Sequence, residues 1–190
     1  MRAFLLSTVL IALGGCSDIE FDQSNQEKIY ITDEKLVIAN QYHGLDENRN
    51  RTELKQFLGV DPVHVEWCAA FVNSVLWGAG IPDTDSLLAR SYLKWGNSVD
   101  IPEKGDIMVF SRGSQAWMGH VGFYAGTVKW KEKDYWVVLG GNQNNTVSYQ
   151  LFPVNSHRLL DIRRYEESEV QVTLSTKNWQ ADGVPIEFAD

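Results

Sequence analysis

The chain has 190 residues, 44% hydrophobic and 22% charged, which is the composition of a globular protein with one core. Its net charge of −8 argues against binding to nucleic acid through a basic surface. Aromatic residues make up 12% of the chain, with seven Trp, and indicate a compact core or a groove lined with rings.

The first sixteen residues have the layout of an export signal. Arg2 supplies a positive start, and the apolar run over residues 3–13 is too short to be a membrane-spanning helix. The run ends in Leu-Gly-Gly-Cys, which resembles a bacterial lipobox. We therefore expect a signal peptide over 1–15 and a lipid on Cys16 that anchors the mature chain to a membrane. The alternative is an ordinary signal peptide in which Cys16 is incidental.

The residue after Cys16 is a serine rather than an aspartate, a sorting pattern that favours the outer membrane. We expect a lipid-anchored location in the bacterial cell envelope, on the periplasmic face, with residues 16–32 as a polar tether. Residues 166–190 form an acidic extension of little pattern. If Cys16 carries lipid, Cys68 has no disulfide partner, and a lone thiol in an oxidising compartment is a liability unless it is buried or used.

Residues 33–165 predict one domain that begins with helices. A helix capped by Asp33 is followed by a second in the segment NRTELKQFLG. A third helix begins near Glu66 or Trp67 and ends at Gly80, and a short fourth lies in SLLARSYLKWG. The third helix has apolar residues at three- and four-residue spacing, which predicts one buried stripe: Phe71, Val72, Val75, Leu76 and Ala79.

After Pro102 the pattern changes to that of strands. Five short segments rich in β-branched and aromatic residues alternate with polar or glycine-bearing turns: DIMVF, GHVGFYAGT, YWVVLGGN, TVSYQLFP and RLLDIRRY. Helices followed by such a meander predict an α+β fold, with the helices on one side of a small antiparallel sheet.

Two residues stand out as candidates for chemistry. Cys68 is expected in the first turn of the third helix, where free backbone N–H groups and the positive end of the dipole favour a thiolate. A lone cysteine at a helix start is nevertheless more often structural. His120 begins a strand between two glycines, which leave room near the ring. The alternative for His120 is a surface histidine at a turn.

Asn142 is the third candidate, at the point where a strand runs into a polar turn. Such Gly-Asn clusters usually only form turns. If the strands around a loop at 128–134 pair Thr127 with Tyr135, however, His120 lies opposite Asn142 on the same face of the sheet. The amide then accepts the imidazole N–H and holds the ring for proton abstraction. A register slip of one residue would turn Asn142 to the other face.

Together these three residues form a set suited to acyl transfer by a cysteine. Thiolate, imidazolium and an orienting amide supply the nucleophile, the base and its support. The backbone N–H of Cys68, with a neighbouring donor, is placed to receive the oxyanion. The combination is far more specific than any one member.

Five segments, in this order, carry a family resemblance: EWCAAFVN, LARSYLKWG, PEKGDIMVFSRG, GHVGFYAG and LGGNQNNTVSY. They resemble the NlpC-type and CHAP-type cell-wall hydrolases, above all a bacterial and phage branch with a Trp-Cys-Ala-Ala-Phe-Val start and a Gly-Gly-Asn-Gln end. The resemblance covers roughly residues 35–165. It implies a papain-like α+β fold, with N-terminal helices packed on a small antiparallel sheet or half-barrel. It also implies hydrolysis of an amide bond in peptidoglycan, within the stem peptide or between muramic acid and L-alanine.

The resemblance also assigns roles. It implies Cys68 as nucleophile, His120 as general base and Asn142 as the orienting residue, with Gln143 as the neighbouring alternative and otherwise a substrate-binding candidate. Many NlpC-type members have histidine in the third place, and asparagine matches the CHAP side. Some CHAP members add a glutamate after the histidine. This chain has GHVGFYAG there, so we expect a triad.

Other residues are candidates for substrate binding. Glu66 binds a substrate ammonium or caps the third helix, and we prefer the cap. Arg90 and Ser91 line a groove that meets a stem-peptide carboxylate, or lie on a solvated helix face. Trp67, beside the nucleophile, and Trp117, just before the histidine, wall the cleft or belong to ordinary packing.

We therefore expect a cysteine hydrolase without cofactor or metal that binds peptidoglycan as a monomer and is held to the membrane through Cys16. An alternative is a catalytically inactive envelope lipoprotein that binds peptidoglycan peptide or a partner protein. A third is an acyltransferase or deamidase on the same scaffold, which product analysis would separate. Whether the bond cleaved is that of an endopeptidase or an amidase depends on the shape of the cleft.

Overall fold

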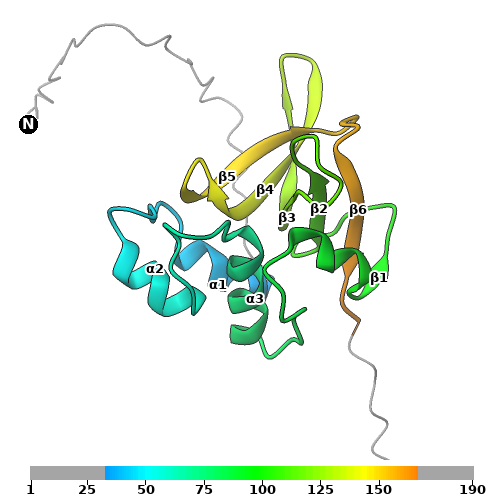
Figure 1. The fold of residues 1–190 in the computed structure, drawn as a ribbon. Coiled ribbons are helices and arrows are strands. Elements are labelled where there is room, and N and C mark those ends of the chain that lie inside the picture. Colours follow the sequence, from blue (N-terminus) through cyan, green and yellow to red (C-terminus); the bar gives the residue numbers. More distant parts are fainter. Residues whose placement is uncertain (1–32, 167–190) are drawn as a thin grey trace, which may run out of the picture. The chain divides into compact units, whose positions relative to one another are not determined.

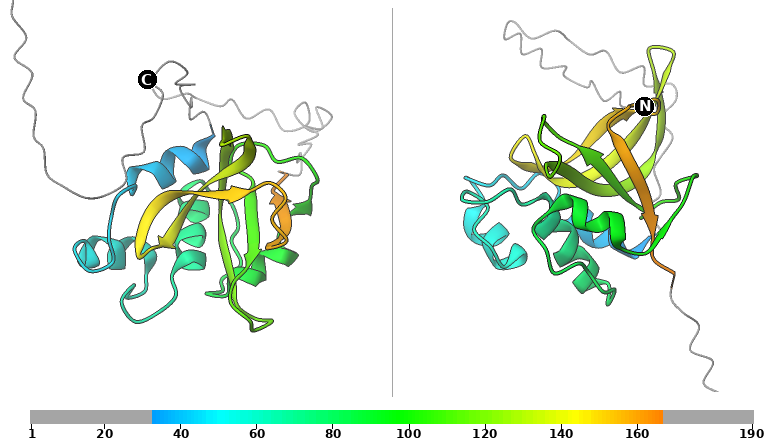
Figure 2. Two further views of the ribbon diagram at one scale, coloured as in Figure 1. Left: turned by 90° about the horizontal axis from the view of Figure 1, so that it is seen from above. Right: turned by 45° about the vertical axis from the view of Figure 1, so that its right-hand side comes forward.

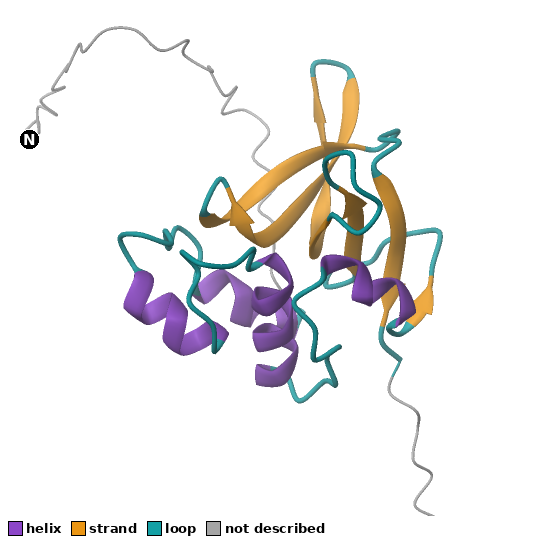
Figure 3. Cartoon of the chain, in the orientation of Figure 1, coloured by secondary structure: helices purple, strands orange, loops and turns teal. Residues whose placement is uncertain are grey.

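The computed structural model describes residues 33–166, which form an α+β domain. The expected signal peptide, the lipidated Cys16 and its tether lie outside the described residues, as does the extension after residue 166. The helices lie on one side of the sheet (Figures 1 and 3). The α+β class is therefore confirmed. Within 33–166 no helix is both long and apolar enough to cross a membrane.

The helices lie in the segments that the sequence predicts, with ends that differ from the predicted ones by up to three residues. They are α1 (Glu34–Gln41), α2 (Arg51–Leu58), α3 (Cys68–Gly78) and the 3-10 helix η2 (Ala89–Lys94). The Asp33 carboxylate caps α1 by accepting the Leu36 N–H at 3.2 Å. Gly59 closes α2 with φ of 69°, a left-handed conformation that glycine adopts without steric cost.

Within residues 33–166, six strands form one antiparallel sheet in the order β1-β6-β2-β3-β4-β5. They are β1 (Asn97–Ser98), β2 (Ile107–Ser111), β3 (Gly119–Trp130), β4 (Lys133–Gln143), β5 (Thr146–Pro153) and β6 (Leu159–Arg164). The sequence predicted all but β1, whose two residues are too few to show a pattern. The strand that comes last in the described part of the chain, β6, is an interior strand of the sheet between β1 and β2.

The sheet curls into a half-barrel (Figure 2). The rings of Phe110 on β2 and Phe152 on β5 stack with centroids 4.1 Å apart. Two strands separate β2 from β5, so in a flat sheet these positions would be about 14 Å apart. The concave face therefore has a small core of its own, and the helices pack on the other face. The buried residues of this small core are Met108, Phe110, Trp136, Val138 and Ile162.

The β3–β4 register differs from the predicted one. Thr127 pairs with Trp136 rather than Tyr135, because the connection is a two-residue turn at Lys131 and Glu132 instead of a loop over 128–134. Both turn residues have positive φ, as a type I′ turn requires. A bulge between Tyr124 and Gly126 then shifts the register by one residue. The predicted register is thus wrong near the turn and correct at the other end of the hairpin, where Phe123 pairs with Leu139.

Candidate active site

Cys68 is the first residue of α3 and a free thiol. At this position its backbone N–H has no acceptor within the helix. The sulfur is a hydrogen-bond acceptor for the backbone N–H groups of Val121 and Ala69, which lower the thiol pKa. The side chain is only 3% exposed, and burial outweighs the N–H groups, so that the pKa of Cys68 is raised.

Two features of the sheet let the start of α3 come this close. The β3–β4 ladder stops at Phe123 and Leu139, and β4 bulges between Gly140 and Gln143. Gly141, in this bulge, has no side chain: a Cβ there would lie 2.6 Å from atoms of both Phe71 and Trp67. The helix therefore packs directly on the backbone of β4, and its N-terminal residue meets β3.

His120 lies next to the residue whose N–H meets the sulfur. It pairs with Phe110 in the β2–β3 register and so shares the concave face, where its ring stacks on Phe152 at 6.1 Å. Val121 and Phe123 point to the helix side. The sulfur thus approaches β3 at its backbone, one residue along from His120. The imidazole is 8% exposed, and this burial lowers its pKa from 6.5 to about 4.

Gln143 holds the imidazole. Its Oε1 lies 3.2 Å from His120 Nε2, and its Nε2 donates to the backbone carbonyls of Val138, Gly140 and Ser148. Because these carbonyls can only accept, the amide nitrogen faces them and Oε1 faces the ring. His120 Nε2 then carries the proton, and Nδ1 keeps the lone pair that a general base needs.

Asn142 is not the residue that contacts His120. Its φ is 57°, and its Nδ2 donates to Glu66 Oε2 at 2.8 Å. The bulge in β4 turns the two neighbouring amides to different partners, so that the expected Asn142–His120 contact is replaced by the Gln143–His120 contact. Asn144 and Asn145, also with positive φ, form the β4–β5 turn.

Glu66 forms no cap on α3, contrary to the preferred interpretation. Besides Asn142 it binds Arg112, whose Nη1 donates to Glu66 Oε2 at 2.8 Å. Arg112 lowers and Glu66 raises the pKa of Cys68, so this ion pair lies close to the thiol. Arg112, which lies in the loop between β2 and β3, was not among the residues predicted from the sequence. The only sequence feature that points to Arg112 is its position as a cation directly after β2, the strand before the one that contains His120.

The remaining candidates divide into two groups. Arg90, Ser91 and Trp117 line one cavity of about 580 Å³. Trp67 is completely buried, and its indole N–H donates to Glu47 Oε2 at 3.0 Å. Its position therefore favours packing over substrate contact.

A larger cavity, of about 1010 Å³, lies between the helices and the loop after α3. Neither cavity is lined by Cys68 or His120. Among residues 33–166, no three or more His, Cys, Asp and Glu side chains are grouped so as to hold a metal ion.

Residues 60–145 match the family model of the CHAP domain. No curated protein matches the chain in a sequence comparison. The matched segment includes Cys68, His120, Asn142 and Gln143, and thus the whole candidate site. CHAP domains are usually hydrolases that act on peptidoglycan. The match over residues 60–145 confirms the resemblance to the CHAP-type cysteine hydrolases in this part of the chain.

Proposed function

We propose that this protein is a cysteine hydrolase that cleaves an amide bond in peptidoglycan, as a stem-peptide endopeptidase or an N-acetylmuramoyl-L-alanine amidase. The observation that carries the proposal is the arrangement around β3. The Cys68 sulfur meets the Val121 N–H, and the adjacent His120 is held through Nε2 by Gln143 with Nδ1 left to accept a proton.

The proposed reaction proceeds through a thioester. Nδ1 of His120 takes the Cys68 proton as the sulfur attacks the carbonyl carbon. The backbone N–H of Cys68 stabilises the oxyanion. The C–N bond then breaks, and the imidazolium returns its proton to the leaving amine. Water, deprotonated by His120, attacks the thioester, releasing a carboxylate and restoring the thiol.

In this proposal Cys68 and His120 are both uncharged before substrate binds. Burial raises the pKa of Cys68 and lowers that of His120 to about 4, so near neutral pH the groups are a thiol and an imidazole. Proton transfer from Sγ to Nδ1 then accompanies the attack on the bound substrate rather than preceding it.

A second candidate is a catalytically inactive envelope lipoprotein that binds cell-wall peptide or a partner protein. The 3% exposure of Cys68 favours it, because an inert structural cysteine is also buried.

In both cases we propose a lipid on Cys16 that anchors the chain in the envelope, probed by labelling with a fatty acid analogue in wild type and in Cys16→Ala.

Purified sacculi separate the two functions. We expect wild type to release soluble muropeptides and Cys68→Ala and Cys68→Ser to release none, because the nucleophile is lost. Circular dichroism and thermal unfolding check that the variants remain folded, and mass spectrometry of the products identifies the bond. Undiminished digestion by a folded Cys68→Ala protein would refute the hydrolase.

A further inference from the structure

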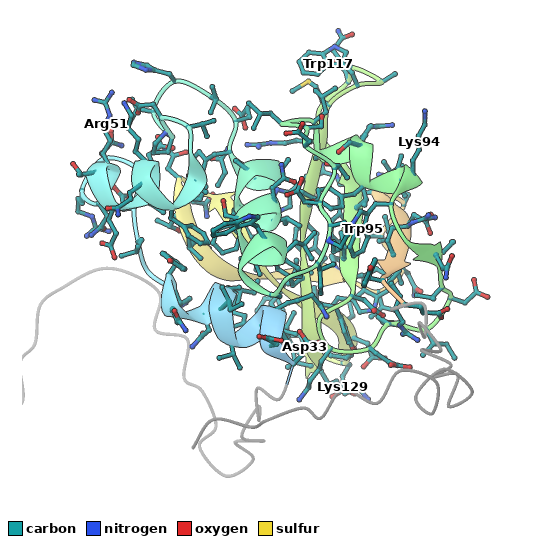
Figure 4. All side chains as sticks on the ribbon, turned by 90° about the horizontal axis from the view of Figure 1, so that it is seen from below. Asp33, Arg51, Lys94, Trp95, Trp117 and Lys129 are labelled. Carbon is teal, nitrogen blue, oxygen red and sulfur yellow. The ribbon has the colours of Figure 1, made fainter. Side chains whose placement is uncertain are left out.

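The cavity of about 580 Å³ beside η2 has the chemistry of an anion site. Two cations, Arg90 and Lys94, line it from successive turns of η2. Trp95 and Trp117 add aromatic surface, and Figure 4 shows Lys94 and Trp117 reaching outward at the same end of the domain.

The two cations have no carboxylate partner among residues 33–166. Arg90 uses its Nε to donate to the Met118 carbonyl at 2.8 Å, and Lys94 forms no ion pair in this part of the chain. The acidic residue in the lining, Asp83, accepts the backbone N–H of Asp85. With two cations against the one carboxylate of Asp83, the lining carries a positive balance that is electrostatically complementary to an anionic ligand.

The rest of the lining favours an anion on an apolar chain. Trp117 is 64% exposed and offers a flat ring to aliphatic groups. Trp95 is almost buried, with its indole N–H bonded to the Pro82 carbonyl, and forms a fixed wall. Ser91 and Thr84, hydrogen-bonded to each other at 2.7 Å, add hydroxyl groups for further polar contacts.

Arg90 connects this cavity to the histidine strand. Its contact Met118 lies two residues before His120, and a Cβ on the intervening Gly119 would lie 3.0 Å from Arg90 Cγ. The missing side chain at Gly119 thus favours the close packing of η2 on the start of β3. A ligand bound by Arg90 is therefore held beside Met118 and Gly119, the two residues that precede His120.

We propose that this cavity binds a free carboxylate of the peptide whose amide bond is cleaved. This inference rests on the proposed function, which identifies the peptide as a stem peptide. With such a site, the enzyme prefers stem peptides with free carboxylates over those with carboxamides. Arg90 positions the carboxylate beside the β3 segment, and Lys94 adds the second charge.

Two synthetic stem peptides that differ only in carboxylates or carboxamides test the proposal. Binding is measured by calorimetry to the full chain carrying Cys68→Ala, so that no turnover occurs. We expect the acid to bind about tenfold more tightly than the amide, as for a charge-assisted contact. Adding Lys94→Gln should remove most of this preference. The matched control is Lys133→Gln, an exposed lysine at the β3–β4 turn.

Equal binding of the acid and the amide would overturn the proposal. So would an equal loss in Lys133→Gln, because the preference would then reflect the overall charge. Cleavage of the same peptides by the wild-type chain is scored separately. If the peptides are cleaved but the acid does not bind more tightly, the hydrolase proposal is supported and the carboxylate site is refuted. If the acid binds more tightly but neither peptide is cleaved, the carboxylate site is supported and the hydrolase proposal is refuted.

Discussion

Asn142 and Gln143 are neighbours with the same functional group and different partners. Because Asn142 adopts a positive φ in the bulge, its amide reaches Glu66, while Gln143 reaches His120. Asparagine is among the residues that tolerate this conformation best. The chain thus divides two tasks between adjacent amides: one secures the loop before α3, and the other orients the base.

We expect Gln143→Ala to lower kcat on the order of 100-fold with little change in KM, because the imidazole loses the partner that fixes its tautomer. The rate of muropeptide release from sacculi measures this. Asn142→Gly is the matched control, since glycine keeps the positive φ and removes only the bond to Glu66. A greater loss in Asn142→Gly than in Gln143→Ala would return the orienting role to Asn142.

The sequence was sufficient to select Cys68 and His120 as candidates, because a helix start and a glycine-flanked strand are local features. It was not sufficient to choose between Asn142 and Gln143. That choice depends on two bulges, in β3 and in β4, and a bulge changes which residues face each other without any strong sequence signal. Arg112 lies in a loop, where side-chain direction follows no period.

At the scale of elements, the position of α3 depends on the backbone of β4. The helix ends were predictable from Asp33, Gly59 and Gly80, because caps and left-handed glycines act locally. The close packing of α3 on the sheet was not predictable from the sequence, because it depends on the absence of a side chain at Gly141. Gly141, which the sequence places near the end of a strand, is a contact point between the helix and the sheet.

We expect Gly141→Ala to destabilise the domain by about 1–3 kcal/mol, because the added methyl group overlaps Phe71 and Trp67. Urea unfolding measures the change. The control is Gly78→Ala, at the other end of α3, where a Cβ would make ordinary contacts with Ile38 at 3.5 Å. There alanine should be neutral or slightly stabilising. Equal effects at the two sites would contradict the packing argument.

At the scale of the whole molecule, burial of His120 makes stability depend on pH. Above pH 6.5 the imidazole is neutral in both the folded and unfolded states. Between 6.5 and about 4 the unfolded chain takes up a proton that the folded chain does not, so stability falls as the pH falls. The group therefore favours folding most above its unfolded pKa.

We expect the wild type to lose about 2 kcal/mol more stability than His120→Gln between pH 7 and pH 5, as measured by urea unfolding. The comparison cancels the other titrating groups, which the two proteins share. An identical pH dependence in both proteins would mean that His120 titrates normally in the folded state.

The interior place of β6 governs when the domain can be completed. β6 is the last strand of residues 33–166, yet β2 and β1 both pair with it. A chain synthesised only as far as residue 158 has β3 on one side of β2 but not β6 on the other, and it leaves that edge of β2 open to other strands. Closure of the sheet is thus a late step of biosynthesis, governed by contacts between distant residues.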